Sequence, residues 1–200
     1  MISAEPTASR TVLVRAPSDL LCLDFANTRF WRGTETPTEQ FSTFTDVTDW
    51  ERENAALLGR RKIASQAADF AAALALREAI YRAFLAIAEA KRPRESDLAA
   101  LALPVDAPRR FGIVPRQDGY AWRVEAGRSA SVEALLAPVL WSTWDLLVGP
   151  RRAKVRRCAN DRCLWLFVDE SKSGTRRWCS MASCGNRAKA HRHYRRKTKG

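Results

Sequence analysis

Four cysteines near the end of the chain constrain its fold more than any other feature. Cys158 and Cys163 form one pair and Cys179 and Cys184 a second; each pair encloses four residues, and 15 residues separate the pairs. Structural zinc is held tetrahedrally by thiolates or imidazoles, and two close pairs on either side of a hairpin-sized stretch can close around one ion. We therefore expect one structural Zn²⁺ on these four cysteines. The alternatives are a buried cluster of reduced cysteines without metal and a redox-sensing dithiol.

The sequence around the cysteines predicts a hairpin followed by a helix. Residues 155–168 read as a hairpin with the first pair at its turn, and a helix is expected from Ser180 or Ser183 through Arg196. Fewer than 50 such highly charged residues rarely fold without a staple, so the metal is expected to be structural. His191 and His193 would bind the metal only if they replaced cysteines, because four cysteines already complete the tetrahedral coordination of zinc. Cys22 lies in an apolar segment and is expected in the core.

Positive charge is concentrated in the same part of the chain. Residues 151–200 hold 16 Lys and Arg against 3 Asp and Glu, a net charge of +13, which leaves −1 for residues 1–150. Basic side chains that neutralise phosphates release condensed counterions and gain affinity, so this segregation favours a nucleic-acid partner. The alternative is a basic tail that improves solubility or contacts RNA without specificity.

The predicted C-terminal helix carries the candidate nucleic-acid contacts. Helical spacing aligns four of its side chains on one side, and further basic residues would bind phosphates. The aligned set is Arg187, His191, Tyr194 and Arg195, and the phosphate set includes Lys189, Arg192 and Arg196. A solvated basic helix end is the alternative.

Residues 1–150 read as a mainly helical α+β domain with a small hairpin. Helices are expected over residues 20–26, 49–58, 66–91, 95–103 and 131–148, and a hairpin over 111–124 around Asp118-Gly119. The change of charge at Gly149-Pro150 places a domain boundary near residue 150. Neither a signal peptide nor a membrane span is expected, so the sequence predicts a cytosolic protein.

Function in the first 150 residues is less clearly marked. Asp24, Asn27, Thr28 and Arg29 cluster at the end of the first predicted helix, where they would line a pocket for a small ligand or cap the helix; we favour the cap. No paired-carboxylate motif, nucleophile elbow or Gly-rich phosphate loop is found. We therefore do not expect an enzyme.

Two motifs resemble known families. The stretch from Trp178 to Arg196, with Cys184-Gly185-Asn186-Arg187 at its centre, resembles the CGNR zinc finger. Residues 21–28, Leu-Cys-Leu-Asp-Phe-Ala-Asn-Thr, resemble the opening of the ABATE domain, the partner of that finger in bacterial stress-induced transcription regulators.

The resemblance implies a treble-clef-like finger over residues 151–200 and a helical α+β domain over 1–150 that holds a ligand. It also implies that the four cysteines are ligands and that Arg187 contacts DNA; Asn186 is either a contact or structural. We expect a DNA-binding transcription regulator acting on double-stranded DNA. The alternative is a zinc-stabilised module for RNA or protein contact. The sequence leaves the oligomeric state open.

Overall fold

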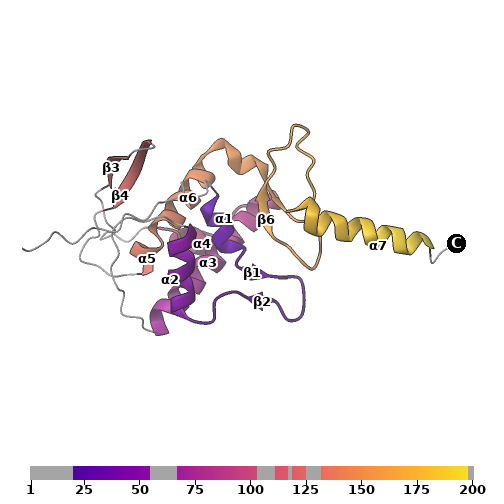
Figure 1. The fold of residues 1–200 in the computed structure, drawn as a ribbon, viewed down its shortest axis with the longest axis horizontal. Coiled ribbons are helices and arrows are strands. Elements are labelled where there is room, and N and C mark those ends of the chain that lie inside the picture. Colours follow the sequence, from indigo (N-terminus) through magenta and orange to yellow (C-terminus); the bar gives the residue numbers. More distant parts are fainter. Residues whose placement is uncertain (1–19, 55–66, 103–110, 117–118, 125–131, 198–200) are drawn as a thin grey trace, which may run out of the picture.

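The computed structural model describes residues 20–54, 67–102, 111–116, 119–124 and 132–197. Over these residues, short antiparallel hairpins surround a group of helices (Figure 1), which confirms the expected mixture of helices and small hairpins. The helices are α1 Leu21–Ala26, α2 Phe44–Asn54, α3 Ala67–Ala88, α4 Glu95–Ala100, α5 Val132–Leu135, α6 Ala137–Val148 and α7 Asn186–Lys197. The strands are β1 Arg29–Phe30, β2 Thr38–Glu39, β3 Phe111–Arg116, β4 Gly119–Val124, β5 Val155–Arg157 and β6 Leu166–Val168.

Helix α3 is the centre of the packing. Its sequence is rich in Ala and Leu, which are strong helix formers. It contacts α1, α2, α4, α5 and both strands β5 and β6. Ile80 and Phe84 are fully buried, and Arg77 is only 2% exposed, so the helix has little free surface at its middle. The helix predicted over residues 66–91 is thus present and forms the centre of the core.

The sequence predicts a helix from Asp49 with Thr48 as its N-terminal cap, but α2 begins five residues earlier, at Phe44, so Thr48 lies inside the helix. The carboxylate of Asp46 accepts hydrogen bonds from the backbone N–H groups of Ser42 and Thr43, at 2.7 and 2.8 Å, and the Asp46 N–H points back to the Thr43 hydroxyl. This reciprocal pairing of Thr43 and Asp46 satisfies N–H groups just before the helix and one in its first turn, and it fixes the start of the helix at Phe44. The end of the predicted helix, residues 55–58, lies outside the described residues.

Proline divides the predicted helix over residues 131–148. Helix α5 ends at Leu135 and α6 starts at Ala137, with Pro138 in its first turn. Proline lacks an N–H group and is tolerated where that group has no partner within the helix, so the second helix starts there. The other predicted helices, α1, α3 and α4, are present with ends shifted by up to three residues.

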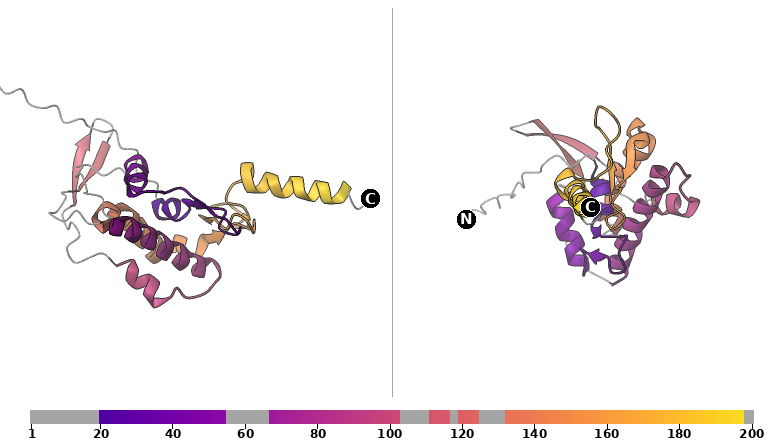
Figure 2. Two further views of the ribbon diagram at one scale, coloured as in Figure 1. Left: turned by 90° about the horizontal axis from the view of Figure 1, so that it is seen from below. Right: turned by 90° about the vertical axis from the view of Figure 1, so that its right-hand side faces the viewer.

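The hairpins lie at different places around the helices. The pair β3–β4 was predicted around its Asp-Gly turn, of which Asp118 lies outside the described residues, and Phe111 faces Val124 in its register. The short pair β1–β2 was not predicted, because two-residue strands leave no alternating pattern. The β3–β4 hairpin and α7 lie at opposite ends of the molecule (Figure 2).

The strands of the C-terminal hairpin belong to the same core as the N-terminal helices. Val155, Leu166 and Val168 are buried in one cluster with side chains of α1, α3 and α6. Helix α7, by contrast, projects away from the rest of the molecule (Figure 1). The C-terminal region is thus anchored at its hairpin and extended at its helix. Within the described residues, no helix is both long enough and apolar enough to cross a membrane.

Candidate metal centre and nucleic-acid interface

The first cysteine pair lies in the turn of residues 158–165 that joins β5 to β6 and is called the zinc-site turn below. The Cys158 N–H donates to the carbonyl of Trp165, and the N–H groups of Cys163 and Leu164 both donate to the carbonyl of Asn160, at 2.8 and 3.2 Å. Leu164 takes a left-handed conformation with φ of 59° to close the turn. These bonds close the turn that carries the first pair, as the predicted hairpin with the pair at its turn requires.

The second pair precedes α7. Cys184 lies in a π-helical turn, Met181–Gly185, which runs directly into that helix. A Cβ at Gly185 would stand 2.7 Å from the Met181 Sδ, so the exposed, flexible Met181 side chain would have to move to admit it. The sequence predicted the helix but not the π turn.

Asn160 joins the two pairs. Its side-chain oxygen accepts from the Arg162 N–H at 3.1 Å, and its side-chain nitrogen donates to the Sγ of Cys184 at 3.4 Å. An N–H donor toward sulfur stabilises the thiolate form that a metal requires. The sequence predicts only that Asn160 lies in the turn of the hairpin over residues 155–168; its spacing from the cysteines gives no sign of this bond.

The sulfur positions fit a tetrahedral metal centre. The four Sγ atoms all lie within 4.8 Å of one another, and the Cys163–Cys179 and Cys179–Cys184 distances are both 3.7 Å. In a tetrahedral zinc site with Zn–S bonds of about 2.3 Å, the sulfurs are about 3.8 Å apart. Three of the four cysteines are buried, and none forms a disulfide. The donor set and its spacing therefore fit Zn²⁺ and leave no open ligand position.

The electrostatics of the cluster also favour a cation. Hydrogen bonds from the Cys163 and Cys179 thiols lower the pKa of Cys158, and donation to that thiolate raises the pKa of both donors. Four thiolates this close repel one another, so they ionise together only when a divalent cation compensates their charge. Cys22 is separate: burial raises the pKa of its thiol to about 12, as expected for a core residue.

Arg176 encloses the centre from outside and was not singled out from the sequence. Its guanidinium donates to the carbonyls of Trp178 and Cys179 and stacks 4.6 Å from the Phe167 ring. Asp169 receives the Arg176 N–H at 2.8 Å and two further bonds from Ser171. This loop therefore holds the second cysteine pair against the β5–β6 hairpin.

The predicted basic residues lie on the projecting helix. Arg187 is in its first turn, with its guanidinium 4.5 Å from the ring of Trp31, and Lys189, His191 and Tyr194 are exposed. Arg192, Arg195 and Arg196 lie further along the same helix. Arg187, His191 and Tyr194 follow the i, i+4, i+7 spacing of one helix face. Asn186 donates to the Ala182 carbonyl at 3.3 Å across the π turn.

The four N-terminal candidates make mostly internal contacts. The buried Asn27 amide pairs with the backbone of Leu166 in β6 in both directions, at 2.8 and 3.1 Å. Thr28 donates to the Phe25 carbonyl at 2.7 Å, and Arg29 stands 4.0 Å from Glu78. Asp24 is exposed on α1. A ligand at these residues stays a prediction; the Asn27 amide holds the C-terminal hairpin.

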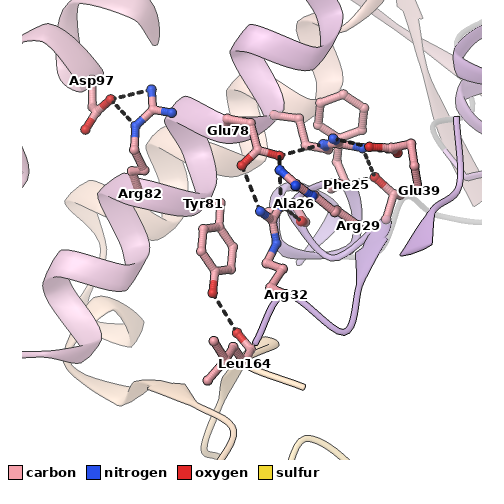
Figure 3. Close-up of polar contacts among 12 residues, drawn as sticks. Phe25, Ala26, Arg29, Arg32, Glu39, Glu78, Tyr81, Arg82, Asp97 and Leu164 are labelled. Atoms are coloured by element: carbon pink, nitrogen blue, oxygen red, sulfur yellow. Dashed lines mark hydrogen bonds and ion pairs between the residues drawn. The ribbon is translucent and has the colours of Figure 1, made fainter. Parts of the chain in front are cut away.

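Further contacts between the two regions involve residues that sequence reasoning missed. The Tyr81 hydroxyl donates to the Leu164 carbonyl at 2.9 Å, and Arg32 lies over the Tyr81 ring while binding both oxygens of Glu78 (Figure 3). Gly33 donates its N–H to the Arg162 carbonyl at 3.2 Å. The zinc-site turn is thus braced by α3 and by the loop after β1.

Comparisons with known proteins divide along the same two regions. A family model described as "CGNR zinc finger" matches residues 154–197, and the ABATE model, described as "Putative stress-induced transcription regulator", matches residues 19–150. No curated protein matches the chain. Since the ABATE match covers well over half of the sequence, and the four cysteines of the finger converge, the chain belongs to the ABATE family and carries a CGNR zinc finger.

Proposed function

We propose that this chain is a transcription regulator that binds double-stranded DNA through α7, with one structural Zn²⁺ on its four clustered cysteines. The observation that carries the proposal is the charge and position of this helix. It holds six Lys and Arg and no acidic residue, and it projects from the molecule (Figure 1). A helix with this many cations has no wide apolar face to bury against the core, and its like charges repel one another. A polyanionic partner would neutralise these charges and so stabilise the helix.

The dimensions of the helix suit a duplex. Its 12 residues span about 18 Å, and the major groove of DNA is about 12 Å wide, enough to admit one helix. The metal would fix the start of the helix, because Cys184 lies in the turn that leads into it. The hairpin with the first pair and the helix with the second pair support a treble-clef-like arrangement. The proposal includes no catalytic step.

The N-terminal region is proposed to act on the finger. Asn27 and Tyr81 hydrogen-bond to the backbone around the first cysteine pair. A ligand or partner that changed the position of α1 or α3 would therefore also change the position of the finger relative to these helices. This supports a sensing role for the N-terminal region in addition to its role in the core.

The proposal is tested by measuring duplex binding of the zinc-loaded chain at several salt concentrations. The variant Lys189→Gln with Arg192→Gln should bind a duplex library more weakly, and its salt slope should fall by about 0.9 for each phosphate that the variant no longer neutralises. Arg52→Gln with Lys91→Gln removes the same charge from exposed sites of the N-terminal region and serves as the matched control.

Two outcomes would overturn the DNA assignment. The first is a wild-type chain that does not bind duplex DNA, and the second is an α7 variant whose binding equals that of the control. Tighter binding to structured RNA than to duplex DNA in the same assay would support the alternative RNA-binding module.

A further inference from the structure

A groove of about 640 Å³ lies between the loop that follows β1 and the first turns of α7. It is lined by Trp31, Thr34 and Thr36 of the N-terminal region, by residues 159–162 of the zinc-site turn, and by Arg187 and His191 of the helix. The groove is therefore built jointly by the two regions. No sequence motif indicated it, because its walls are more than 120 residues apart in the chain.

The groove presents donors suited to a phosphate chain. Arg162, Arg187 and His191 line it against a single carboxylate, that of Asp161. The guanidinium of Arg187 stands 4.5 Å from the centre of the Trp31 ring. This contact uses the face of the guanidinium and leaves the N–H groups at its edge able to donate. The Thr36 hydroxyl makes no hydrogen bond within the described part of the chain and is exposed.

The groove is continuous with the proposed DNA-binding face of α7. Arg187 and His191 belong to the helix face that leads on to Tyr194, which is 69% exposed. From Arg187 to Tyr194 the helix advances about 10 Å. A strand of nucleic acid that follows this face toward the start of the helix therefore arrives at the groove.

We propose that the groove holds one sugar–phosphate strand of the bound duplex, so that the loop of residues 31–36 is part of the nucleic-acid interface. This inference rests on the proposed function and extends it from the finger to the N-terminal region. Arg162 and Arg187 bind phosphates, Thr36 donates to a phosphate oxygen, and the strand passes on the side away from Asp161.

The loop is already held in place for this role. The Gly33 N–H is bonded to the Arg162 carbonyl at 3.2 Å, and the Thr34 hydroxyl and N–H both bond to the Trp31 carbonyl, at 2.8 and 3.0 Å. Binding therefore does not have to order the loop, and the entropy cost of association is smaller. Any shift of the N-terminal region also moves one wall of the groove, which links that region directly to nucleic-acid affinity.

The test places charge at the wall of the groove that belongs to the N-terminal region. Thr36→Lys should strengthen duplex binding and raise the salt slope by about 0.9, since it adds one cation that neutralises a phosphate. Thr36→Glu should weaken binding by about two- to fivefold. Thr45→Lys and Thr45→Glu make the same changes at an exposed threonine of α2 and control for the general effect of net charge. Full-length zinc-loaded protein is used throughout, and its circular dichroism spectrum verifies the fold of each variant.

The outcomes separate this inference from the proposed function. Opposite effects of the two Thr36 variants, larger than those at Thr45, support the groove. Equal effects at Thr36 and Thr45, together with weaker binding of the α7 variant, overturn the groove and leave DNA binding by α7 intact. A wild-type chain that binds no duplex overturns both.

Discussion

At the residue scale, Arg77 has the greatest need for hydrogen-bond partners, because its charged guanidinium is buried. It forms two hydrogen bonds with the Glu39 carboxylate, at 2.5 and 2.6 Å, and a third with Glu78 at 3.1 Å. Figure 3 shows where the Glu39 and Glu78 carboxylates lie. A buried charge is stable only when it is paired and fully hydrogen-bonded. The unpredicted β1–β2 hairpin supplies Glu39, so this small hairpin has a clear structural role.

Replacing the Glu39 carboxylate should lower the stability of the fold by an amount that depends on pH. Burial alone would raise the pKa of Glu39, but the Arg77 hydrogen bonds outweigh it and hold the pKa below the ordinary 4.5. A lowered pKa means that the carboxylate stabilises the fold above pH 4.5 and loses this effect as the pH falls through the folded-state pKa. Glu39→Gln should therefore lower the free energy of unfolding at pH 7 by roughly 1–2 kcal/mol, with a smaller difference from wild type in acid.

Urea titrations of both proteins from pH 7 to pH 3 measure this difference. Glu53→Gln, at an exposed carboxylate of α2, is the matched control and should behave as wild type. A difference between Glu39→Gln and wild type that stays constant over this range would show that the ion pair is not the cause.

At the element scale, regular patterns were predictable and local geometry was not. The apolar spacing of α3 and the Asp-Gly turn of β3–β4 have their causes within a few neighbouring residues, and both elements are present. The start of α2 depends on the pairing of Thr43 with Asp46, and Thr48, also followed by acidic residues, was an equally reasonable cap in the sequence. The four cysteines were predictable because metal chemistry dictates their spacing, whereas Trp31 and Gly33 meet the zinc-site turn only in three dimensions.

Two glycines test this difference between local and tertiary constraints. A Cβ at Gly33 would lie 1.7 Å from the backbone oxygen of Asp161, whereas a Cβ at Gly174 meets nothing within 4 Å but requires a φ of 61°. Gly174→Ala should cost about 1 kcal/mol from backbone strain alone. Gly33→Ala should cost more, roughly 2–4 kcal/mol, because the loop must separate from the zinc-site turn.

Thermal unfolding and competition with a zinc chelator measure both effects. Gly33→Ala should lower the melting temperature and weaken zinc retention, and Gly174→Ala should lower only the melting temperature, and by less. Equal loss of stability in the two variants would contradict the close contact at Gly33.

At the scale of the whole molecule, the charge step near residue 150 predicts two domains, yet hydrophobic contacts cross it. Val155, Leu166 and Val168 pack in the core of the N-terminal helices, and the Asn27 amide bonds to Leu166. The sequence identified these residues as a hairpin but not the surface on which they pack, because any apolar face satisfies the same alternation. The division into domains at residue 150 stays a prediction.

Metal removal should therefore affect both regions. The zinc-site turn contains Leu164, whose carbonyl receives the Tyr81 hydroxyl of α3, and β6 follows it directly. Loss of the metal frees this turn and removes side chains from the shared core. It should therefore lower the protection of α1 and α3 amides against hydrogen exchange, in addition to that of the finger amides.

Elemental analysis should give about one zinc per chain for the wild type and for Cys22→Ala, and much less for Cys184→Ser. Hydrogen exchange on the full chain with and without chelator completes the measurement: protection lost around Cys158 alone, with α1 and α3 unchanged, would show that the finger unfolds independently and that the shared core does not couple the two regions.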